Sequence, residues 1–459
     1  MKINFTFKLG ATALLLCGGV FMSAHAQSLP DTLTLTLDQA ITIALSDNPT
    51  IKVADMEIER VDYSRKETLC NLFPSIDFSG SYSRTLKKQV MYMSAMKDMG
   101  MEDGIEVGLD NSWSTGFSAS LPIIAPSLWK SLKLSSNQVE QTLEKARASR
   151  IAMVASVKDA FYGVLLAEDS YAVLRQSYEN AKTVAGDFRN KFDQGIASEY
   201  DVLRSEVAVH NYEPSLLQAE NAVRLAKLNL KVLLGIDGDI KIGLNDKLIA
   251  YEKSMYENAM QPDTSIQNNT NLKQLDLQTA YLKQAVKVQN MQWAPTLALA
   301  ASYTWTSMSD GGMFKEFHWN PYSYVGLSLS IPIFHGGTRY FKSKQARTSY
   351  NEMHYQRLNL ERNLRMQVTA AVDNINKSVK QVASSKESVR QAEKAYKIMQ
   401  KRFEVGAATI IELNDANLTL VSSNLSYYQA IHDYLAAITE LEEISGNVDL
   451  SRYETSHAN

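Results

Sequence analysis

Four short segments of the chain alternate between apolar and small polar residues. They lie at about 75–86, 112–122, 296–306 and 322–332. A period of two predicts β-strands, because successive side chains of a strand point to opposite faces. Each predicted strand therefore has one apolar face and one face that is almost entirely Ser, Thr, Gly and Ala. Both a soluble sheet packed on a core and a lipid-facing barrel with a wet interior would produce this pattern.

Strand length and aromatic residues favour the lipid-facing barrel. About ten residues is the length of a membrane-spanning strand. Aromatic residues gather toward one end of the strands, as in an interfacial girdle; they are Tyr82, Trp113, Tyr303, Trp305, Trp319, Tyr322 and Tyr324. Four strands are too few, because about eight is the practical minimum for a closed barrel. The chain must then pool its strands with copies of itself, as a dimer or as a trimer.

Two long stretches, about 128–194 and 340–405, are predicted to be helices that pack as coiled coils. Apolar residues at heptad spacing mark a seam on each; they are Val157, Phe161, Val164, Tyr171 and Tyr178 and, 211 positions later, Val368, Val372, Ile375, Val382 and Val389. At about 1.5 Å per residue each helix would reach roughly 100 Å. Gly195 and Gly406 end these helices, and a second helix of about 35 residues returns from each, since glycine suits the position beyond a helix end.

The chain consists of two tandem repeats. Residues Lys191–Gly195 match Arg402–Gly406 at an offset of 211, and Pro74–Tyr82 match Pro295–Tyr303 at an offset of 221. Internal repetition of this kind fixes the domain plan before any other feature does. We expect five segments: a signal peptide over 1–26, a first repeat over 27–235 with its hairpin tip at 195, a polar linker over 236–269, a second repeat over 270–446 with its tip at 406, and a C-terminal tail over 447–459.

The first 26 residues are typical of a secretory signal peptide. Lys2 and Lys8 precede an apolar core, and Ala24-His25-Ala26 forms an A-x-A cleavage site. Cys17 falls within this segment, which leaves Cys70 without an intrachain partner. No later run of about 18 apolar residues appears, so no spanning helix is predicted.

Charge and motifs exclude several classes of function. The 459 residues carry 47 Lys+Arg and 50 Asp+Glu, a net charge of -3, whereas a nucleic-acid binder needs a basic surface. P-loop, HExxH and CxxC motifs are missing from the sequence. His335-Gly336-Gly337 has the composition of an oxyanion loop, but no nucleophile elbow accompanies it. We therefore expect neither an enzyme nor a bound cofactor.

At this point the sequence resembles the TolC-like outer-membrane factor family, also called outer membrane efflux proteins. The matching pieces follow the duplicated order over nearly the whole chain after the signal peptide; they are Leu37-Asp38-Gln39-Ala40-Ile41, Ala44-Leu45, Asn48-Pro49, Pro74, Tyr82, Leu121-Pro122-Ile123, Ile331-Pro332-Ile333-Phe334, Phe192-Asp193-Gln194-Gly195 and Phe403-Glu404-Val405-Gly406-Ala407-Ala408-Thr409. The resemblance implies an α+β membrane protein that is complete as a homotrimer. Its twelve-stranded outer-membrane β-barrel would continue as a long α-helical coiled-coil barrel across the periplasm.

The resemblance also implies partners and a location. The trimer would stand in the lipid of the cell outer membrane, and a periplasmic adaptor (membrane fusion protein) and an inner-membrane transporter of the RND or ABC type would dock below it. The predicted function is the passive exit duct of a tripartite efflux or type I secretion system. The alternative is an exported coiled-coil scaffold or surface structural protein without a pore. The alternating strands favour the duct, because a scaffold needs no lipid-facing strands.

Several site residues are implied by the resemblance. Glu412 and Asp415, which share a helix face, would line the periplasmic entrance as a cation-attracting ring whose mutual repulsion favours opening. Glu412 also completes a capping box with Thr409, which explains it equally well. Asp201 would make a closed-state contact at the tip. The adaptor would dock on the hairpin tips, at Gly195, Ala197, Ser198, Gly406, Ala407 and Thr409.

Two positions depart from the family pattern, and one cluster stands outside it. Ala408 replaces an Arg and Phe403 replaces a Tyr in the closed-state network of the best-known members, so that network is not expected here. One candidate for a Cu(I) site is a thioether cluster in the loop between the first two strands. Its flexible side chains would equally suit a plain apolar patch. The cluster comprises Met91, Met93, Met96, Met99 and Met101.

Overall fold

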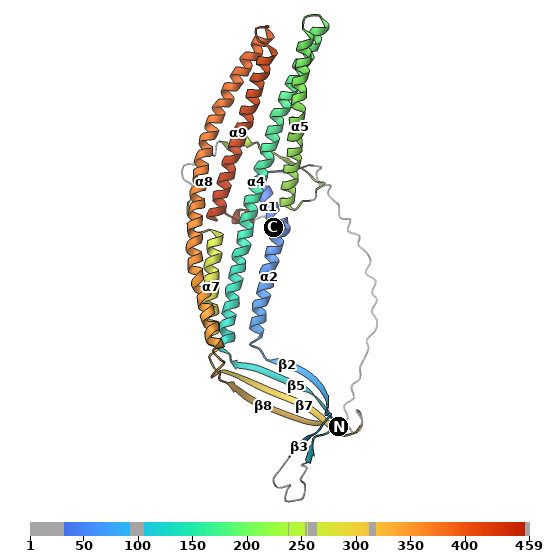
Figure 1. The fold of residues 1–459 in the computed structure, drawn as a ribbon, viewed down its shortest axis with the longest axis vertical. Helices are drawn as coiled ribbons and strands as arrows, with labels where there is room; N and C mark the ends of the chain where they lie inside the picture. Colours follow the sequence, from blue (N-terminus) through green and yellow to red (C-terminus); the bar gives the residue numbers. More distant parts are fainter. Residues whose placement is uncertain are drawn as a thin grey trace, which may run out of the picture.

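The structure is a computed structural model that describes residues 32–91, 105–236, 238–252, 255, 264–311 and 318–454. The chain is elongated, with a four-stranded sheet toward one end and the tips of two helical hairpins at the other (Figure 1). The hairpins are formed by α4 (Pro126–Asp193) with α5 (Glu199–Leu234), and by α8 (Thr338–Glu404) with α9 (Ile410–Ser445). The predicted architecture of two repeats with long helices is confirmed.

Shorter elements surround the middle of the long helices and extend them toward the sheet. The helices are α1 (Leu37–Asp47), α2 (Pro49–Cys70), α7 (Thr270–Met291), α10 (Ser451–Glu454) and the 3-10 helix η1 (Leu248–Tyr251). The short strands β1 (Thr32–Leu35) and β6 (Lys241–Leu244) pair with each other. A second short pair, β3 (Gln89–Met91) with β4 (Ile105–Val107), lies instead beyond the far end of the main sheet (Figure 1). None of the described helices is both long and apolar enough to cross a membrane.

The main sheet is antiparallel in the order β2-β5-β7-β8. Its strands are β2 (Ser75–Arg84), β5 (Asn111–Ile124), β7 (Thr296–Ser309) and β8 (Asn320–Ser330). The two central strands run to 14 residues, beyond the end of their apolar alternation, because each has a hydrogen-bonding neighbour on both sides. Within the described chain, β2 and β8 each have one edge without a partner strand.

The register of the sheet places the apolar residues of all four strands on one face. Directly paired residues of antiparallel strands share a face. Phe78 pairs with Phe117, and Phe117 pairs in turn with Tyr303. Tyr322 and Tyr324 pair instead with threonine and serine of β7, on the opposite, hydroxyl-rich face. Their assignment to the same aromatic girdle as Tyr303 was therefore wrong, because the period of two puts neighbours of even and odd number on different faces.

The end of α5 meets the start of α2, so that the two helices follow one another along the wall. Gly235 ends α5 with φ 68°, and a Cβ placed there would come 3.0 Å from the backbone oxygen of Asp47. The Asn48 side chain connects the two helices. Its Nδ2 donates to the Leu233 carbonyl at 2.8 Å, and its Oδ1 accepts from the Thr50 N–H at 2.7 Å. One asparagine thus caps α2 and satisfies a free carbonyl of α5.

The same junction recurs in the second repeat, where α9 meets α7. Gly446 ends α9 with φ 69°. Asn269 Nδ2 donates to the Ile444 carbonyl at 2.7 Å, and Asn269 Oδ1 accepts from the Leu272 N–H at 2.9 Å. The spacing is tighter than in the first repeat, because a Cβ on Gly446 would lie only 2.1 Å from the Asn268 carbonyl oxygen. The duplication therefore extends to individual side-chain hydrogen bonds.

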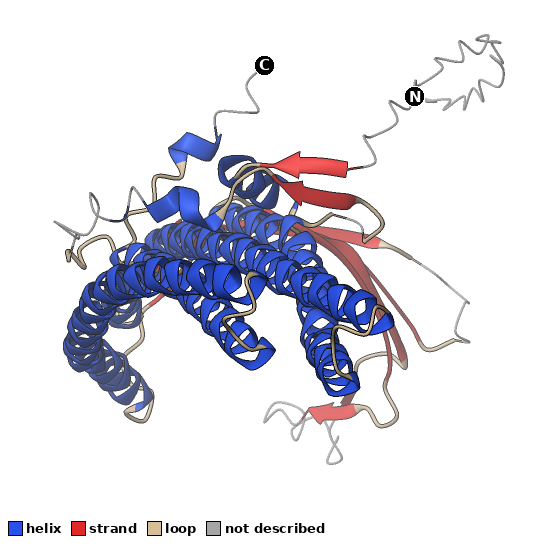
Figure 2. Ribbon diagram, turned by 90° about the horizontal axis from the view of Figure 1, so that it is seen from above, coloured by secondary structure: helices blue, strands red, loops and turns tan. Residues whose placement is uncertain are grey.

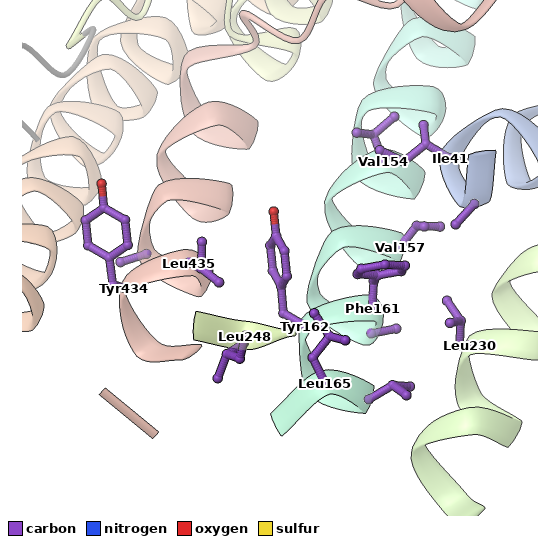
Figure 3. Packing of buried hydrophobic residues seen from close by; sticks show 14 of the residues in the cluster. Ile41, Val154, Val157, Phe161, Tyr162, Leu165, Leu230, Leu248, Tyr434 and Leu435 are labelled. Carbon is purple, nitrogen blue, oxygen red and sulfur yellow. The ribbon is translucent and has the colours of Figure 1, made fainter. Parts of the chain in front are cut away.

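The apolar core lies where α4 passes between α1, α5 and α9. Val157 and Phe161 on α4 are completely buried, with Ile41 of α1 and Leu230 of α5 beside them (Figure 3). These α4 residues belong to the seam predicted from heptad spacing. Burial of several large side chains here, at about 1.5–3 kcal/mol each, fixes the middle of the molecule, whereas both ends are one layer thick.

The segment 236–269, expected to be a polar linker or equatorial segment, also contributes to the core. It supplies β6 to the pair with β1, and Ile242, Leu248 and Met255 are buried in the central core. The Tyr434 hydroxyl of α9 donates to the Met255 carbonyl at 3.0 Å. These apolar residues are few and lack a regular period, so the sequence alone did not reveal their packing.

Seen along its length, the helical part forms an arc (Figure 2). The β1–β6 pair and α10 lie outside the arc, on its convex side. In the predicted C-terminal tail, α10 is tied down by an ion pair between Arg452 and Asp38 of α1. The concave side of the arc is left to the long helices themselves, and any duct would run along it.

Candidate functional site at the hairpin tips

Each hairpin turns at a glycine in the left-handed conformation. Gly195 has φ 74° and Gly406 has φ 75°, which a residue with a Cβ rarely adopts. In the second turn the Ala407 N–H donates to the Arg402 carbonyl at 2.7 Å, and Arg402 Nη2 donates to the Ala407 carbonyl at 3.0 Å. The arginine therefore closes its own turn. Gly195, Gly406 and Ala407 are all exposed at the tips.

Both return helices begin with complete capping boxes. Asp201 N–H donates to Ser198 Oγ at 3.2 Å, and Asp201 Oδ2 accepts from Ser198 Oγ at 2.6 Å and from the Ser198 N–H at 3.4 Å. In the second hairpin Glu412 Oε2 accepts from the Thr409 N–H at 2.7 Å and from its hydroxyl at 2.9 Å. In the single chain Asp201 is thus occupied within its own hairpin, as is Glu412.

The two acidic residues predicted for the entrance have different surroundings. The Thr409 backbone N–H, then the Thr409 hydroxyl and the nearby charge of Arg402, hold the pKa of Glu412 below its usual value. Asp415 lies one turn further along α9 and is exposed. None of the described ion pairs uses the Asp415 carboxylate. Of the two side chains, Asp415 therefore has the fewer competing contacts.

An aromatic contact joins the two hairpins near their tips. The rings of Phe188 on α4 and Phe403 on α8 are 5.7 Å apart. Lys191 Nζ lies 5.8 Å from the Phe188 ring and 5.9 Å from the Phe403 ring, within the range of a cation–π interaction. Phe403 is one of the two departures noted in the sequence. Here it makes a ring contact where a tyrosine would offer a hydroxyl, and Ala408 beside the turn is half-buried.

A buried hydrogen bond joins the hairpins again further from the tips. Asn417 Nδ2 on α9 donates to the Tyr212 hydroxyl on α5 at 2.9 Å. Both side chains are less than one-tenth exposed. Burial raises the pKa of the Tyr212 hydroxyl, and the bond to Asn417 opposes that shift. The sequence analysis missed this pair, because one Tyr and one Asn 205 positions apart carry no detectable pattern.

The tips also expose apolar side chains that the sequence analysis did not select. Ile196 is 72% exposed and Val405 is 78% exposed, each directly beside a turn glycine. Ala197 is half-buried between Ile196 and the exposed Ser198. Because single exposed apolar residues are common, the informative point is that each tip has one beside its turn glycine, after Gly195 in the first hairpin and before Gly406 in the second.

The methionine cluster lies mostly outside the described residues. Met91 ends β3 and is 40% exposed; Met93, Met96, Met99 and Met101 are not described. Among the residues that the structure describes, no three His, Cys, Asp or Glu side chains come together as metal ligands would.

The family model described as "Outer membrane efflux protein" matches residues 40–236 and 262–447. The outer membrane protein TolC of Vibrio cholerae is 22% identical over 347 residues, which cover 73% of this chain and 77% of that protein. The toxin and drug export protein A of Aggregatibacter actinomycetemcomitans is 22% identical over 415 residues, 87% of this chain and 84% of that protein.

Solved structures share the fold. The CmeC outer membrane channel of Campylobacter jejuni superposes with a TM-score of 0.70 at 17% identity, covering 89% of this chain and 85% of that one. The outer membrane protein VceC of Vibrio cholerae gives a TM-score of 0.69 at 14% identity, covering 89% and 96%. The family match includes both repeats and both hairpin tips. This chain therefore belongs to the outer membrane efflux protein family: it is a non-enzymatic outer-membrane channel of the efflux and type I secretion kind, with a periplasmic helical tunnel.

Proposed function

We propose that three copies of this chain form one closed duct. The observation that carries the proposal is the main sheet, which has an apolar face, a hydroxyl-rich face and, among the strands that the structure describes, two edges without a partner. Exposed strand edges pair with other strands unless they are protected. Pairing β8 of one copy with β2 of the next would close twelve strands into a barrel whose apolar face meets lipid.

The flanks of the helical arc support the same assembly. On one flank α5 exposes a stripe of large apolar residues, and on the other α8 does the same. Exposed apolar stripes on helices are typical of surfaces that pack against another chain. The exposed residues are Leu203, Val207, Leu217, Leu225 and Val232 on α5, and Tyr355, Leu358, Met366 and Ile398 on α8. Packing α5 of one copy against α8 of the next would cover both stripes.

The tips are the proposed docking point for the periplasmic adaptor. Gly195, Ala197 and Ser198 on one hairpin, and Gly406, Ala407 and Thr409 on the other, are supported as contacts by their place at the end of the molecule and by the apolar side chains beside them. The adaptor would link the duct to an inner-membrane transporter of the RND or ABC type. The transporter supplies the energy and selects the cargo.

Glu412 and Asp415 are proposed to line the periplasmic entrance. In a trimer they would place six carboxylates near the closed end. Repulsion between these carboxylates favours opening, and their negative charge attracts cations. Asp201 is proposed to contribute to the closed tip by holding the first turn in shape through its capping box.

Reconstitution in a planar lipid bilayer tests the duct. The purified protein should migrate as a heat-sensitive trimer and give small, stable conductance steps. A protein that stays soluble, forms coiled-coil oligomers and never inserts would instead establish the pore-free scaffold.

A further inference from the structure

A hollow of about 470 Å³ lies between the two hairpins, where α5 and α9 come together. Leu418 on its wall is nine residues before Tyr427, which is two and a half helical turns. The two side chains therefore point to opposite sides of α9. Tyr427 faces Glu252 of the central segment that packs on the convex side, with a hydroxyl-to-carboxylate distance of 2.9 Å. The hollow accordingly opens on the concave side of the arc seen in Figure 2.

The lining combines an apolar floor with neutral hydrogen-bonding groups. Leu174, Leu418 and Leu425 supply the apolar surface, and amide and hydroxyl side chains such as Asn211 and Ser422 supply polar contacts. Carboxylate, ammonium and guanidinium groups are missing from the described lining. A volume of this size falls in the usual range for small-molecule sites, which are mostly apolar with a few placed polar groups.

The hollow also contains a buried polar pair. The Tyr212 hydroxyl accepts from Asn417 Nδ2 at 2.9 Å, and Tyr212 itself lines the hollow. A neutral hydroxyl in a largely apolar setting keeps the capacity to donate to a ligand, because its proton is not used by the asparagine. The hollow therefore offers a ligand one hydrogen-bond donor, held in place on an otherwise apolar wall.

Two side chains of opposite charge lie near the end of the hollow that faces the hairpin tips. Arg204 on α5 and Asp415 on α9 occupy matching positions of the two repeats, 211 residues apart. Each lies within about one turn of a lining residue, Ala208 and Asn414 respectively. Neither of these two side chains lines the hollow itself, so a net charge inside it would be desolvated without a partner.

We propose that this hollow binds an uncharged amphipathic small molecule, with its ring or chain on the leucines and a hydrogen-bonding group at Tyr212. The proposal rests on the proposed function, in which the concave side is the lumen of the duct. A molecule in the hollow bridges α5 and α9 beside the bond that joins the hairpins. Uncharged amphipathic compounds thus have a resting place on the wall, directly beside the acidic entrance.

Protection of an introduced thiol tests the site. In the trimeric channel in lipid nanodiscs, Cys70→Ser removes the exposed native thiol, and Ser422→Cys places one in the hollow. The probe is N-phenyl-1-naphthylamine, which is uncharged, and its comparison is 8-anilino-1-naphthalenesulfonate, which adds only a charged group. The uncharged probe should slow maleimide labelling of Cys70→Ser/Ser422→Cys. At equal free concentration the sulfonate should bind at least about tenfold more weakly, because its charge would be buried without a partner.

A matched control and a second variant remove the simpler explanations. Ser388→Cys, on an exposed part of α8 outside the hollow, should show no protection by either probe. Ser426→Cys, also on the lining, repeats the measurement if the first variant assembles poorly. Leu418→Trp fills the hollow and should abolish protection of the thiol in both the Ser422→Cys and the Ser426→Cys variant. Equal protection by both probes, protection of the control thiol, or no protection in a channel that is trimeric and conducts would overturn the site. The last result leaves the duct itself intact, whereas a channel that never inserts would refute the proposed function.

Discussion

The two hairpins are copies of one design, and they differ mainly in what covers them. Each has a long helix of 67 or 68 residues, a return helix of 36, a left-handed glycine and a capping box. Yet thirteen residues of α9 are buried, whereas only five residues of α5 are. The central segment packs its Met255 and Glu252 against α9. On α5 a stripe of large apolar side chains stays exposed.

This contrast shows what duplication preserves. The local chemistry of turns, caps and junctions is repeated, since each depends on residues close in sequence. Burial is not repeated, because it depends on what lies outside the repeat. On α9 the cover comes from the same chain, and for α5 we propose that it comes from the next copy. The following experiments test that contrast.

The largest effect is expected at the tighter of the two junctions. Gly446→Ala should prevent assembly or strongly lower the temperature at which the trimer dissociates, because its Cβ would lie 2.1 Å from a backbone oxygen at a positive φ. Left-handed backbone alone costs a residue with a Cβ about 1–2 kcal/mol, and overpacking adds about 1–3 kcal/mol. Gly235→Ala is the matched control, with 3.0 Å to its nearest atom. A larger loss in Gly235→Ala would show that the junctions do not behave as the spacing predicts.

A smaller effect is expected at the bond between the hairpins. Tyr212→Phe removes the acceptor of Asn417 and leaves a buried amide unsatisfied, at a cost of about 1–3 kcal/mol. Because that bond joins α5 to α9, the hairpins should separate more readily. Single-channel recording should show a larger open fraction than for the native channel. Tyr178→Phe, at a half-buried position on α4 outside the hollow, should leave gating unchanged. Equal gating in both variants would mean that this bond does not hold the hairpins together.

Sequence reasoning succeeded where the signal is local or periodic. Alternation located the four strands, and heptad spacing found Val157, Phe161 and Val164, all of which are completely buried. The family resemblance supplied the assembly and the entrance residues. Contacts between distant residues left no such trace. Tyr212 with Asn417 and Phe188 with Phe403 each needed the hairpins to be placed side by side, and the packing of the central segment needed its partners.

A more modest effect is expected at the entrance. Asp415→Asn should reduce cation selectivity and block by divalent cations more than Glu412→Gln does, because Glu412 is also committed to its capping box. Reversal potentials in asymmetric salt, with and without a divalent cation, measure both properties. The double variant should lose more than either alone, since the two carboxylates share a helix face. Selectivity that is unchanged in the double variant would remove both residues from the entrance.

The smallest effect concerns carboxylates on the concave side near the middle of the molecule. Asp159, Asp433, Glu440 and Glu443 line a hollow of about 460 Å³ with Lys377 as its cation. Partial burial raises the pKa of Glu443, and the neighbouring Asp159 and Glu440 raise it further. Burial likewise raises the pKa of Asp159, with Glu440 adding to the shift and His432 opposing it. This is the opposite direction from Glu412 at the tip, whose pKa is lowered.

The two directions predict opposite responses to acid. A carboxylate with a raised pKa in the folded state takes up a proton there before the unfolded chain does, so folding is stabilised as the pH falls through the raised value. The native trimer should therefore dissociate at a higher temperature at a pH slightly above 4.5, the ordinary carboxylate pKa, than at pH 7.5. Glu443→Gln should be more stable than the native trimer at pH 7.5. It should also lose part of the stability that the native trimer gains on acidification. Glu412→Gln should keep that gain in stability on acidification. The Glu412 carboxylate stabilises the fold above the ordinary pKa of 4.5, and this contribution declines only below that pH. A pH profile that is identical for the native channel and Glu443→Gln would show that the concave carboxylates are as well hydrated as those at the tip, and that the middle of the duct is electrostatically no different from its entrance.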